Sequence, residues 1–280
     1  MTIRTILGSV LMAGLAGAVL TGPSQAQPGR AAAELAGSGM EQRSTASMPA
    51  RRNVAGYILA AIDDPQRPAA DRDRDAERKP AEMMAFARVK PGDTVVDFIP
   101  GGGYFTRIFS RIAGPGGKVY AVVPDGLAAI YPAAVKAADA ISTPAYANVT
   151  PVVASMDQLA SKGPVDVVWT SQNYHDLHGP KLLPTTALDV DKAVFAALKP
   201  GGVFVVEDHA AEPGSGLRDA GTLHRIDPAV VRKEVTSVGF IVDAETPILR
   251  NPADTHTAKV FDPAIRGHTD QFLIRFRKPA

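Results

Sequence analysis

The chain contains no cysteine among its 280 residues. This absence excludes disulfide stapling and lipid attachment at a cysteine side chain. The sequence also lacks an excess of charge of either sign, because its formal net charge is +1. A field this weak would not draw the protein to nucleic acid or to an acidic membrane surface, so we expect no nucleic-acid partner.

The apolar stretch Ile6–Leu20 is too short to span a bilayer comfortably. Arg4 precedes this stretch, and residues 24–26 (Ser-Gln-Ala) have the small-x-small form of a cleavage site. The arrangement predicts a secretory signal peptide over residues 1–26 that is cleaved after Ala26, with an uncleaved membrane anchor as the alternative. We therefore expect a periplasmic or secreted protein with no stable membrane insertion after cleavage.

The composition changes after the predicted cleavage site. Residues 27–52 are rich in Ala, Gly, Ser and Gln and show little periodicity, which predicts a flexible linker. The whole chain is 45% apolar and 21% charged, as in ordinary globular proteins. We expect residues 53–280 to form one folded domain.

Apolar runs alternate with helical patterns through this domain. The runs predict strands at Thr94–Phe98, Lys118–Val123, Val149–Ala154, Val165–Thr170, Val203–Glu207, Phe240–Glu245 and Gln271–Arg277. Helical spacing predicts helices over residues 54–62, 80–89, 104–112, 126–140, 191–198 and 228–238, and a solvated helix face over 71–78. This order predicts a doubly wound α/β fold, in which a mostly parallel sheet has helices on both faces and ends in an antiparallel pair.

The segment between the first strand and its helix contains three consecutive glycines, Gly101, Gly102 and Gly103. Glycine lets the backbone approach a ligand where a side chain would clash. A buried strand, a glycine loop and a helix N-terminus together predict a nucleotide-type site.

Two residues of this segment distinguish the kind of nucleotide. A dinucleotide-binding loop has a third glycine three residues after its second, and that position is Thr106 here. Asp97 ends the strand, where its negative charge would face a phosphate. A carboxylate suits instead a ligand without phosphate whose amino and sulfonium groups are positive.

The pattern Asp-Phe-Ile-Pro-Gly-Gly-Gly from Asp97 resembles the first motif of the class I S-adenosylmethionine-dependent methyltransferases, with Ile99 where that family has its first glycine. The resemblance extends over residues 70–280. Leu-Lys-Pro-Gly-Gly from Leu198 and Val-Gly-Phe from Val238 are similar to the family's turns before its fifth and sixth strands. Exported bacterial predicted methyltransferases share the Asn-Tyr-His-Asp segment and the C-terminal Asp-Pro-Ala-Ile-Arg-Gly and Asp-Gln-Phe segments. The resemblance implies the family's seven-stranded sheet.

The resemblance also implies S-adenosylmethionine as the cofactor. The glycine loop would pack on its methionine part and Asp97 would hold its amino group. Val123 stands where the family has an acid for the ribose, and Asp125 is the nearby substitute. The implied cofactor-binding residues are Asp97, Pro100, Gly101, Gly102, Gly103, Tyr104, Phe105, Asp125, Asp157, Asn173 and Tyr174, with Ser155 as the alternative to Asp157 for the adenine.

Histidines follow the fourth and fifth predicted strands. We predict catalytic roles for His175, His209 and His224, since the ordinary histidine pKa suits a proton acceptor near neutral pH. His178 is three residues after His175, and His-x-x-His with a more distant ligand can hold zinc. The spacing matches no strong metal motif, so the sequence assigns no metal ligand.

The sequence favours a methyltransferase that acts on a small-molecule acceptor. S-adenosylmethionine is made in the cytoplasm, so a non-catalytic periplasmic protein that binds a small molecule is the main alternative, and a metal-assisted hydrolase is a third. Residues 251–269 are too long for a hairpin turn and predict an ordered flap over the substrate or a structural clasp. The identity of the acceptor and the oligomeric state do not follow from the sequence.

Overall fold

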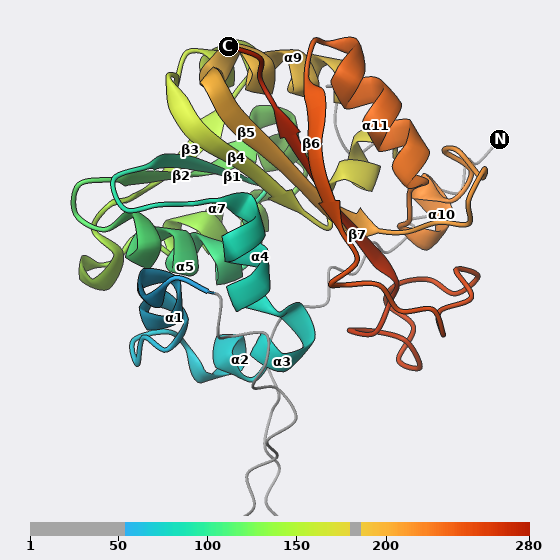
Figure 1. Cartoon of the computed structure of the whole chain (residues 1–280), viewed down its shortest axis with the longest axis horizontal. Coiled ribbons are helices and arrows are strands. Elements are labelled where there is room, and N and C mark those ends of the chain that lie inside the picture. Colours follow the sequence, from blue (N-terminus) through green and yellow to red (C-terminus); the bar gives the residue numbers. More distant parts are fainter. Residues whose placement is uncertain (1–53, 180–185) are drawn as a thin grey trace, which may run out of the picture. The chain divides into compact units, whose positions relative to one another are not determined.

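Seven strands form one sheet in the order β3-β2-β1-β4-β5-β7-β6 (Figure 1). The computed structural model describes residues 54–179 and 186–280, which lie in one compact unit. The strands are β1 (Thr94–Phe98), β2 (Lys118–Pro124), β3 (Val149–Ala154), β4 (Val165–Ser171), β5 (Leu198–His209), β6 (Ile241–Thr246) and β7 (Gln271–Arg277). β1 to β5 pair in parallel, whereas β7 runs antiparallel to both β5 and β6. The predicted doubly wound α/β fold and its final antiparallel pair are confirmed.

Helices cover both faces of the sheet because successive strand residues point to opposite sides. Val95 belongs to an apolar core that includes residues of α1, α4 and α5, and its neighbour Val96 belongs to a second core that includes residues of α6 to α9 and α11 on the other face. The helices are α1 (Gly56–Ile62), α2 (Ala69–Arg72), α3 (Asp75–Arg78), α4 (Pro80–Ala87), α5 (Tyr104–Ala113), α6 (Asp125–Ile130), α7 (Pro132–Asp139), α8 (Met156–Ala160), α9 (Ala187–Ala197), α10 (Ala220–Leu223) and α11 (Pro228–Ser237). Two 3₁₀ helices, η2 (Pro144–Tyr146) and η3 (Tyr174–His178), complete the described elements.

Three predicted elements differ from the structure in more than the position of their ends, whereas others are only shifted, as in α9, which begins at Ala187 instead of Asp191. The helix predicted over 126–140 is two helices, because Pro132 disfavours the helical conformation at Tyr131, whose φ of −136° and ψ of 73° interrupt it. The predicted solvated face over 71–78 is divided between α2 and α3. Its carboxylates bond to side chains elsewhere, Asp71 to Arg107 at 2.7 Å and Asp75 to Arg67 at 2.7 Å.

The fifth strand is longer than predicted. β5 begins at Leu198, so the Lys-Pro-Gly-Gly segment predicted as a turn belongs to it. The irregularity appears in the pairing with β4, where Val165 faces Leu198 but Val167 faces Val203. Between these two pairs one residue of β4 lies opposite four residues of β5, so the pairing is irregular along the Lys-Pro-Gly-Gly segment.

The signal peptide predicted over 1–26, its cleavage after Ala26 and the linker predicted over 27–52 lie outside the described residues. None of the helices in the described ranges combines the length and apolar character that crossing a membrane requires.

The connection between β6 and β7, residues 247–270, is ordered and bonded to the rest of the domain. Arg225 and Asp254 form a bidentate ion pair with distances of 2.8 and 3.2 Å, and both side chains are fully buried. Nε of Arg225 also donates to the carbonyl of Ala258 at 3.0 Å. These bonds support the predicted structural clasp and hold the segment beside the carboxyl ends of the parallel strands, together with α3 (Figure 1).

Candidate functional site at the carboxyl ends of the strands

The chain turns to opposite sides of the sheet after β1 and β4, which are neighbours in the centre of the sheet. Open α/β sheets bind ligands at such a switch in strand order. Asn173 joins the two strand ends, because its side-chain amide donates to the carbonyls of Ile99 at 3.1 Å and Ser171 at 2.6 Å.

The loop after β1 has left-handed backbone at alternate positions. The φ angles are +60° at Ile99, +55° at Gly101 and +81° at Gly103. Ile99, which stands where the resemblance expects a glycine, therefore has left-handed backbone although its β-branched side chain makes that conformation strained.

The glycines differ in what surrounds them. A Cβ at Gly103 would lie 2.5 Å from the side chain of Ile141, so packing requires this glycine. Gly101 and Gly102 are exposed, and a Cβ at either would meet no atom within 4 Å. Arg107 holds the loop by donating to the carbonyl of Gly102 at 2.7 Å. The space beside Gly101 and Gly102 is open to a ligand.

Asp97 lies beneath this loop and is 3% exposed. Its Oδ2 accepts a hydrogen bond from the hydroxyl of Thr106 at 2.6 Å. Burial raises the pKa of Asp97 to about 7, although the hydrogen bond from Thr106 and the positive charge of Arg78 favour its ionised form. A cation bound here would stabilise the carboxylate.

Tyr104 and Phe105 turn away from the open side of the loop. The hydroxyl of Tyr104 donates to Asp75 at 2.6 Å, and the ring of Phe105 packs 4.8 Å from that of Trp169 in the core. The guanidinium group of Arg78 lies over both rings, at 4.8 and 4.7 Å. Both residues anchor α3 and the start of α5.

Asp125 and Asp157 are exposed residues in the first turns of α6 and α8, directly after β2 and β3. Oδ1 of Asp125 accepts from the backbone N–H of Gly126 at 2.7 Å. Val123 is buried at 1% exposure, so the structure places no carboxylate at the end of β2 itself. Pro100 is half-buried beside the loop glycines.

Tyr174 points to the side of the sheet that α9 and α11 cover. Its hydroxyl lies 2.9 Å from Asp191 and 3.2 Å from Glu234, which also bonds to His178 at 2.9 Å. Burial and the nearby Asp191 raise the pKa of Tyr174 above its ordinary value, and burial raises the pKa of Asp191 to about 8. His178 is therefore not part of the histidine group at the strand ends.

His175, Asp176 and His224 come together beside β5. Asp208 binds His175 twice, through its backbone N–H at 2.7 Å and its Nδ1 at 2.8 Å. The rings of His175 and His224 have centroids 5.3 Å apart.

The carboxylates around His175 shift its pKa. Burial lowers the pKa of His175, but the carboxylates of Asp208 and Asp176 outweigh it and raise the value to about 10. Burial alone would raise the pKa of Asp176, and hydrogen bonds from His175 and His224 lower it below its ordinary value. His175 is thus protonated at neutral pH in this environment, and a role as proton acceptor would require it to lose that proton first.

His209 has a different environment. Its Nδ1 lies 2.7 Å from the hydroxyl of Thr269, and its ring centroid is 6.2 Å from that of His175. Burial and the positive charges of His175 and Arg225 lower the pKa of His209 to about 3. Its imidazole is neutral at physiological pH.

The sequence did not identify Arg78, Ser171 and Glu207 as a connected group. Arg78 donates to the hydroxyl of Ser171 at 3.0 Å, and this hydroxyl donates to Oε2 of Glu207. Burial raises the pKa of Glu207. The position of Glu207 at a strand end was the available signal, but its partners lie far away along the chain.

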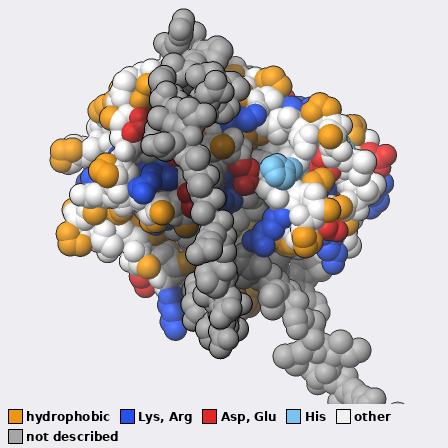
Figure 2. Space-filling view, turned by 90° about the horizontal axis from the view of Figure 1, so that it is seen from below, with side chains coloured by type: hydrophobic (Ala, Val, Ile, Leu, Met, Phe, Trp, Pro, Cys, Tyr) orange, Lys and Arg blue, Asp and Glu red, His pale blue; other side chains and the backbone are white. Residues whose placement is uncertain are grey.

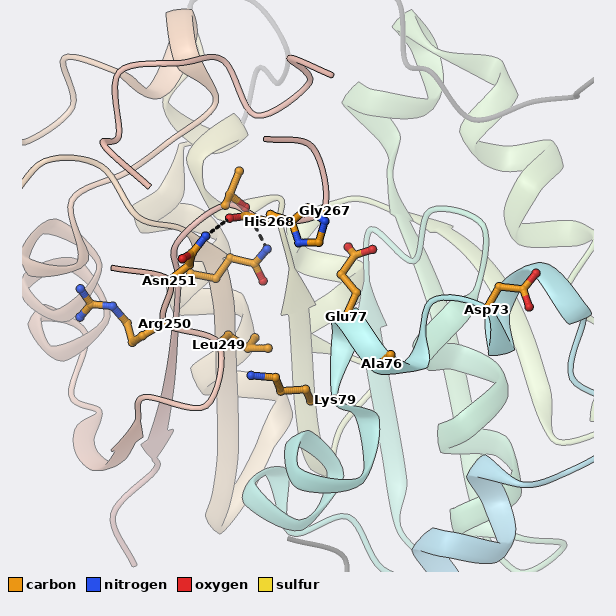
Figure 3. A pocket seen from close by; sticks show the side chains of 11 residues that line it. Asp73, Ala76, Glu77, Lys79, Leu249, Arg250, Asn251, Gly267 and His268 are labelled. Atoms are coloured by element: carbon orange, nitrogen blue, oxygen red, sulfur yellow. Dashed lines mark hydrogen bonds between the residues drawn. The ribbon is translucent and has the colours of Figure 1, made fainter. Parts of the chain in front are cut away.

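An open pocket of about 480 Å³ lies between α3 and the connection from β6 to β7 (Figure 3). Glu77 and Lys79 line one side, whereas Asn251 and His268 line the other. Thr269 also lines it and bonds to His209, so the pocket borders the strand ends. Figure 2 shows the side of the molecule on which the pocket lies. The described surface visible there mixes acidic, basic and hydrophobic side chains around an exposed histidine.

No family model and no curated protein matches the sequence. Solved structures do match the fold. A SAM-dependent methyltransferase from Aquifex aeolicus is 16% identical, with a TM-score of 0.51, and the match covers 74% of this chain and 94% of that protein. A protein from Galdieria sulphuraria assigned as a sarcosine dimethylglycine methyltransferase is 18% identical, with a TM-score of 0.54 and coverage of 75% and 88%.

Identities this low establish the architecture, and chemistry does not follow from architecture alone. The agreement nevertheless extends over nearly the whole of both solved proteins. The sheet order, the antiparallel β7 and the glycine loop after β1 were all described from this chain alone. The chain therefore has the fold of the class I S-adenosylmethionine-dependent methyltransferases.

Proposed function

We propose that the protein is an S-adenosylmethionine-dependent methyltransferase. The observation that carries the proposal is the loop after β1, where left-handed backbone at positions 99, 101 and 103 follows the buried Asp97. This conformation leaves two exposed glycines beside open space at the switch point of the sheet.

The residues in and near the loop after β1 fit the cofactor. Gly101 and Gly102 leave the space that a ligand close to the backbone needs. The Asp97 carboxylate is suited to the amino group of the methionine part, and a cation there would favour its ionised form. Asp125 and Asp157 are exposed at the ends of the next two strands, in positions suited to the ribose and the adenine.

S-adenosylmethionine supplies an activated methyl group for in-line displacement, so the protein's task is to align the acceptor with it. His209 is neutral and buried beside Thr269, where it can orient an acceptor by a hydrogen bond. His175 is protonated and held by Asp208, which makes it a hydrogen-bond donor at neutral pH. An acceptor that reacts through an existing lone pair fits these two states best.

The acceptor is proposed to be a small molecule. The pocket beside His209 has a volume of about 480 Å³, within the range of small-molecule sites. The predicted signal peptide supports a periplasmic or secreted location, and such a location would require a supply of cofactor outside the cytoplasm.

A non-catalytic small-molecule-binding protein on the same fold is the second candidate. Val123 favours it, because this buried apolar side chain replaces the carboxylate that the family uses to hold the ribose. A buried ribose hydroxyl without a partner would cost about 1–3 kcal/mol of binding free energy.

Calorimetric titration with S-adenosylmethionine and S-adenosylhomocysteine tests the proposal. The first variant is Gly102→Leu, which fills the open space beside the loop, and its control is Gly116→Leu. Both glycines are exposed, neither has a left-handed φ, and a Cβ at either meets nothing within 4 Å. A leucine at either position should therefore leave the fold intact.

We expect the wild-type protein and Gly116→Leu to bind both ligands at micromolar concentration, and Gly102→Leu to lose at least tenfold in affinity. Absence of heat with either ligand, from folded wild-type protein, would refute the cofactor site and favour the second candidate. Equal affinity in the two leucine variants would show that any binding occurs elsewhere.

A further inference from the structure

Three side chains with metal-ligand atoms meet after β4 and β5. Nε2 of His175 lies 3.2 Å from Nδ1 of His224 and 3.3 Å from Oδ1 of Asp176, and the last two atoms are 3.6 Å apart. In a tetrahedral zinc site with bonds of about 2.0–2.1 Å, neighbouring ligand atoms are about 3.3–3.4 Å apart. The three atoms thus already have the spacing of one face of a coordination tetrahedron.

Asp208 orients His175 for this arrangement. Its Oδ1 lies 2.8 Å from Nδ1 of His175, and its Oδ2 accepts from the backbone N–H of the same residue at 2.7 Å. Asp208 itself is fully buried. A carboxylate bonded to the far nitrogen of a metal-binding histidine fixes the ring and makes the other nitrogen a better ligand.

His224 is held in place by the backbone and by the connection from β6 to β7. Its φ of +57° is left-handed, an uncommon conformation for a residue other than glycine. The ring packs 4.9 Å from Phe261, and the next residue, Arg225, is bound to the buried Asp254. These contacts fix where the ring of His224 lies.

Hydrogen bonds hold the cluster when no ion is present, but no single hydrogen bond joins all three atoms. A proton on Nε2 of His175 points toward one acceptor, because hydrogen bonds favour a nearly straight geometry. Here a nitrogen and an oxygen both lie within 3.3 Å of that atom. A metal ion placed between the three atoms would bond to all of them at once.

One side of the cluster is open to solvent. The side chain of His175 is 3% exposed, whereas those of His224 and Asp176 are 24% and 19% exposed. Three protein ligands with a free fourth position are characteristic of catalytic zinc sites, and structural sites have four.

We propose that His175, Asp176 and His224 bind one divalent transition-metal ion of the zinc type. Two imidazole nitrogens and one carboxylate suit zinc, iron or nickel better than magnesium or calcium. The fourth position would accept water or an oxygen or sulfur atom of a substrate. The site stands on its own geometry and does not depend on the proposed methyl transfer. An ion bound at Nε2 of His175 would displace the proton from that atom, so the hydrogen-bond donor described above belongs to the metal-free protein.

Zinc titration of the purified protein, without an affinity tag and after treatment with a chelator, tests the site. The variant is His224→Asn and its control is His256→Asn. Both histidines have left-handed backbone, with φ of +57° and +63°, which asparagine adopts more readily than most residues. His256 bonds to Asp270 and lies outside the cluster. Thermal unfolding without metal checks that both variants are folded.

We expect the wild-type protein and His256→Asn to bind one Zn²⁺ per chain, and His224→Asn to lose at least 100-fold in affinity. Co²⁺ should produce visible absorption bands in the wild-type protein that His224→Asn abolishes. Asp208→Asn should weaken Zn²⁺ binding by about 10–100-fold, as for other partners of metal-binding histidines.

Three results would overturn the proposal. They are no binding of Zn²⁺, Co²⁺ or Fe²⁺ by the wild-type protein, equal affinities in the two asparagine variants, and cobalt bands that persist in His224→Asn. If His224→Asn fails to fold, Asp176→Asn takes its place with the same expected loss, because the side chain of Asp176 is half-buried and its removal leaves both imidazoles.

Discussion

Replacement of Asp97 by asparagine should change how the stability of the protein depends on pH. Burial raises the pKa of Asp97 from 3.8 in the unfolded chain to about 7 in the folded protein. The folded state therefore binds the proton more tightly, and this contribution to stability is complete below pH 3.8 and lost as the pH rises to 7. The full difference of about 3 pKa units corresponds to about 4 kcal/mol.

Urea unfolding at pH 5 and pH 8 measures this contribution. At pH 5 about two thirds of the stabilisation from Asp97 remains, and at pH 8 almost none remains. The contribution of Asp97 to the free energy of unfolding therefore differs by roughly 2–3 kcal/mol between the two pH values. The asparagine side chain in Asp97→Asn would have the same shape and could still accept the hydrogen bond from Thr106, but it would not titrate. From pH 5 to pH 8, the free energy of unfolding of the wild type should fall by this amount more than that of Asp97→Asn.

The same variant links stability to binding. Asp97→Asn should be more stable than the wild type at pH 8, because it avoids a buried carboxylate, and it should lose the thermal shift that S-adenosylmethionine produces. Equal changes in unfolding free energy between the two pH values in both proteins would refute the burial argument. Retained cofactor binding in the variant would refute the proposed role of Asp97.

Two further predictions concern packing. Gly103→Ala should destabilise the protein by about 2–3 kcal/mol in urea unfolding, because it adds a clash with Ile141 to the strain of left-handed backbone. Gly101→Ala has the backbone strain alone and should lose only about 1 kcal/mol. Equal losses in the two variants would contradict this expectation. Arg225→Met should cost about 3–5 kcal/mol in the same assay, since it leaves the fully buried Asp254 without its positively charged partner and with only backbone N–H groups as donors. A change below about 1 kcal/mol would contradict that expectation.

The local sequence was sufficient to predict most of the strands. The bounds of β1, β3 and β7 agree with the prediction to the residue, because each is a short, mostly apolar segment that polar residues, glycine or proline interrupt at both ends. The glycine loop, Asp97 and the start of α5 were recognisable for the same reason: they are adjacent in the chain. The predictions failed where a longer-range pairing or a proline changed the local tendency, as at the start of β5 and at Tyr131.

The histidine group shows the limit of such local patterns. His175 was recognised as a candidate, but its partners Asp208 and His224 lie 33 and 49 residues away along the chain. The sequence placed polar residues after β4 and β5, and the order of these strands as neighbours in the sheet brings them into contact.

The sequence therefore determined which segments are buried strands and where glycine and aspartate meet a ligand-binding loop, because these depend on residues close together in the chain. The tertiary structure determined the partners of each ionisable side chain and hence its charge. The pKa values of Asp97, His175 and His209 lie near 7, 10 and 3. Burial and neighbouring charges cause these differences, and both exist only once distant segments have packed together.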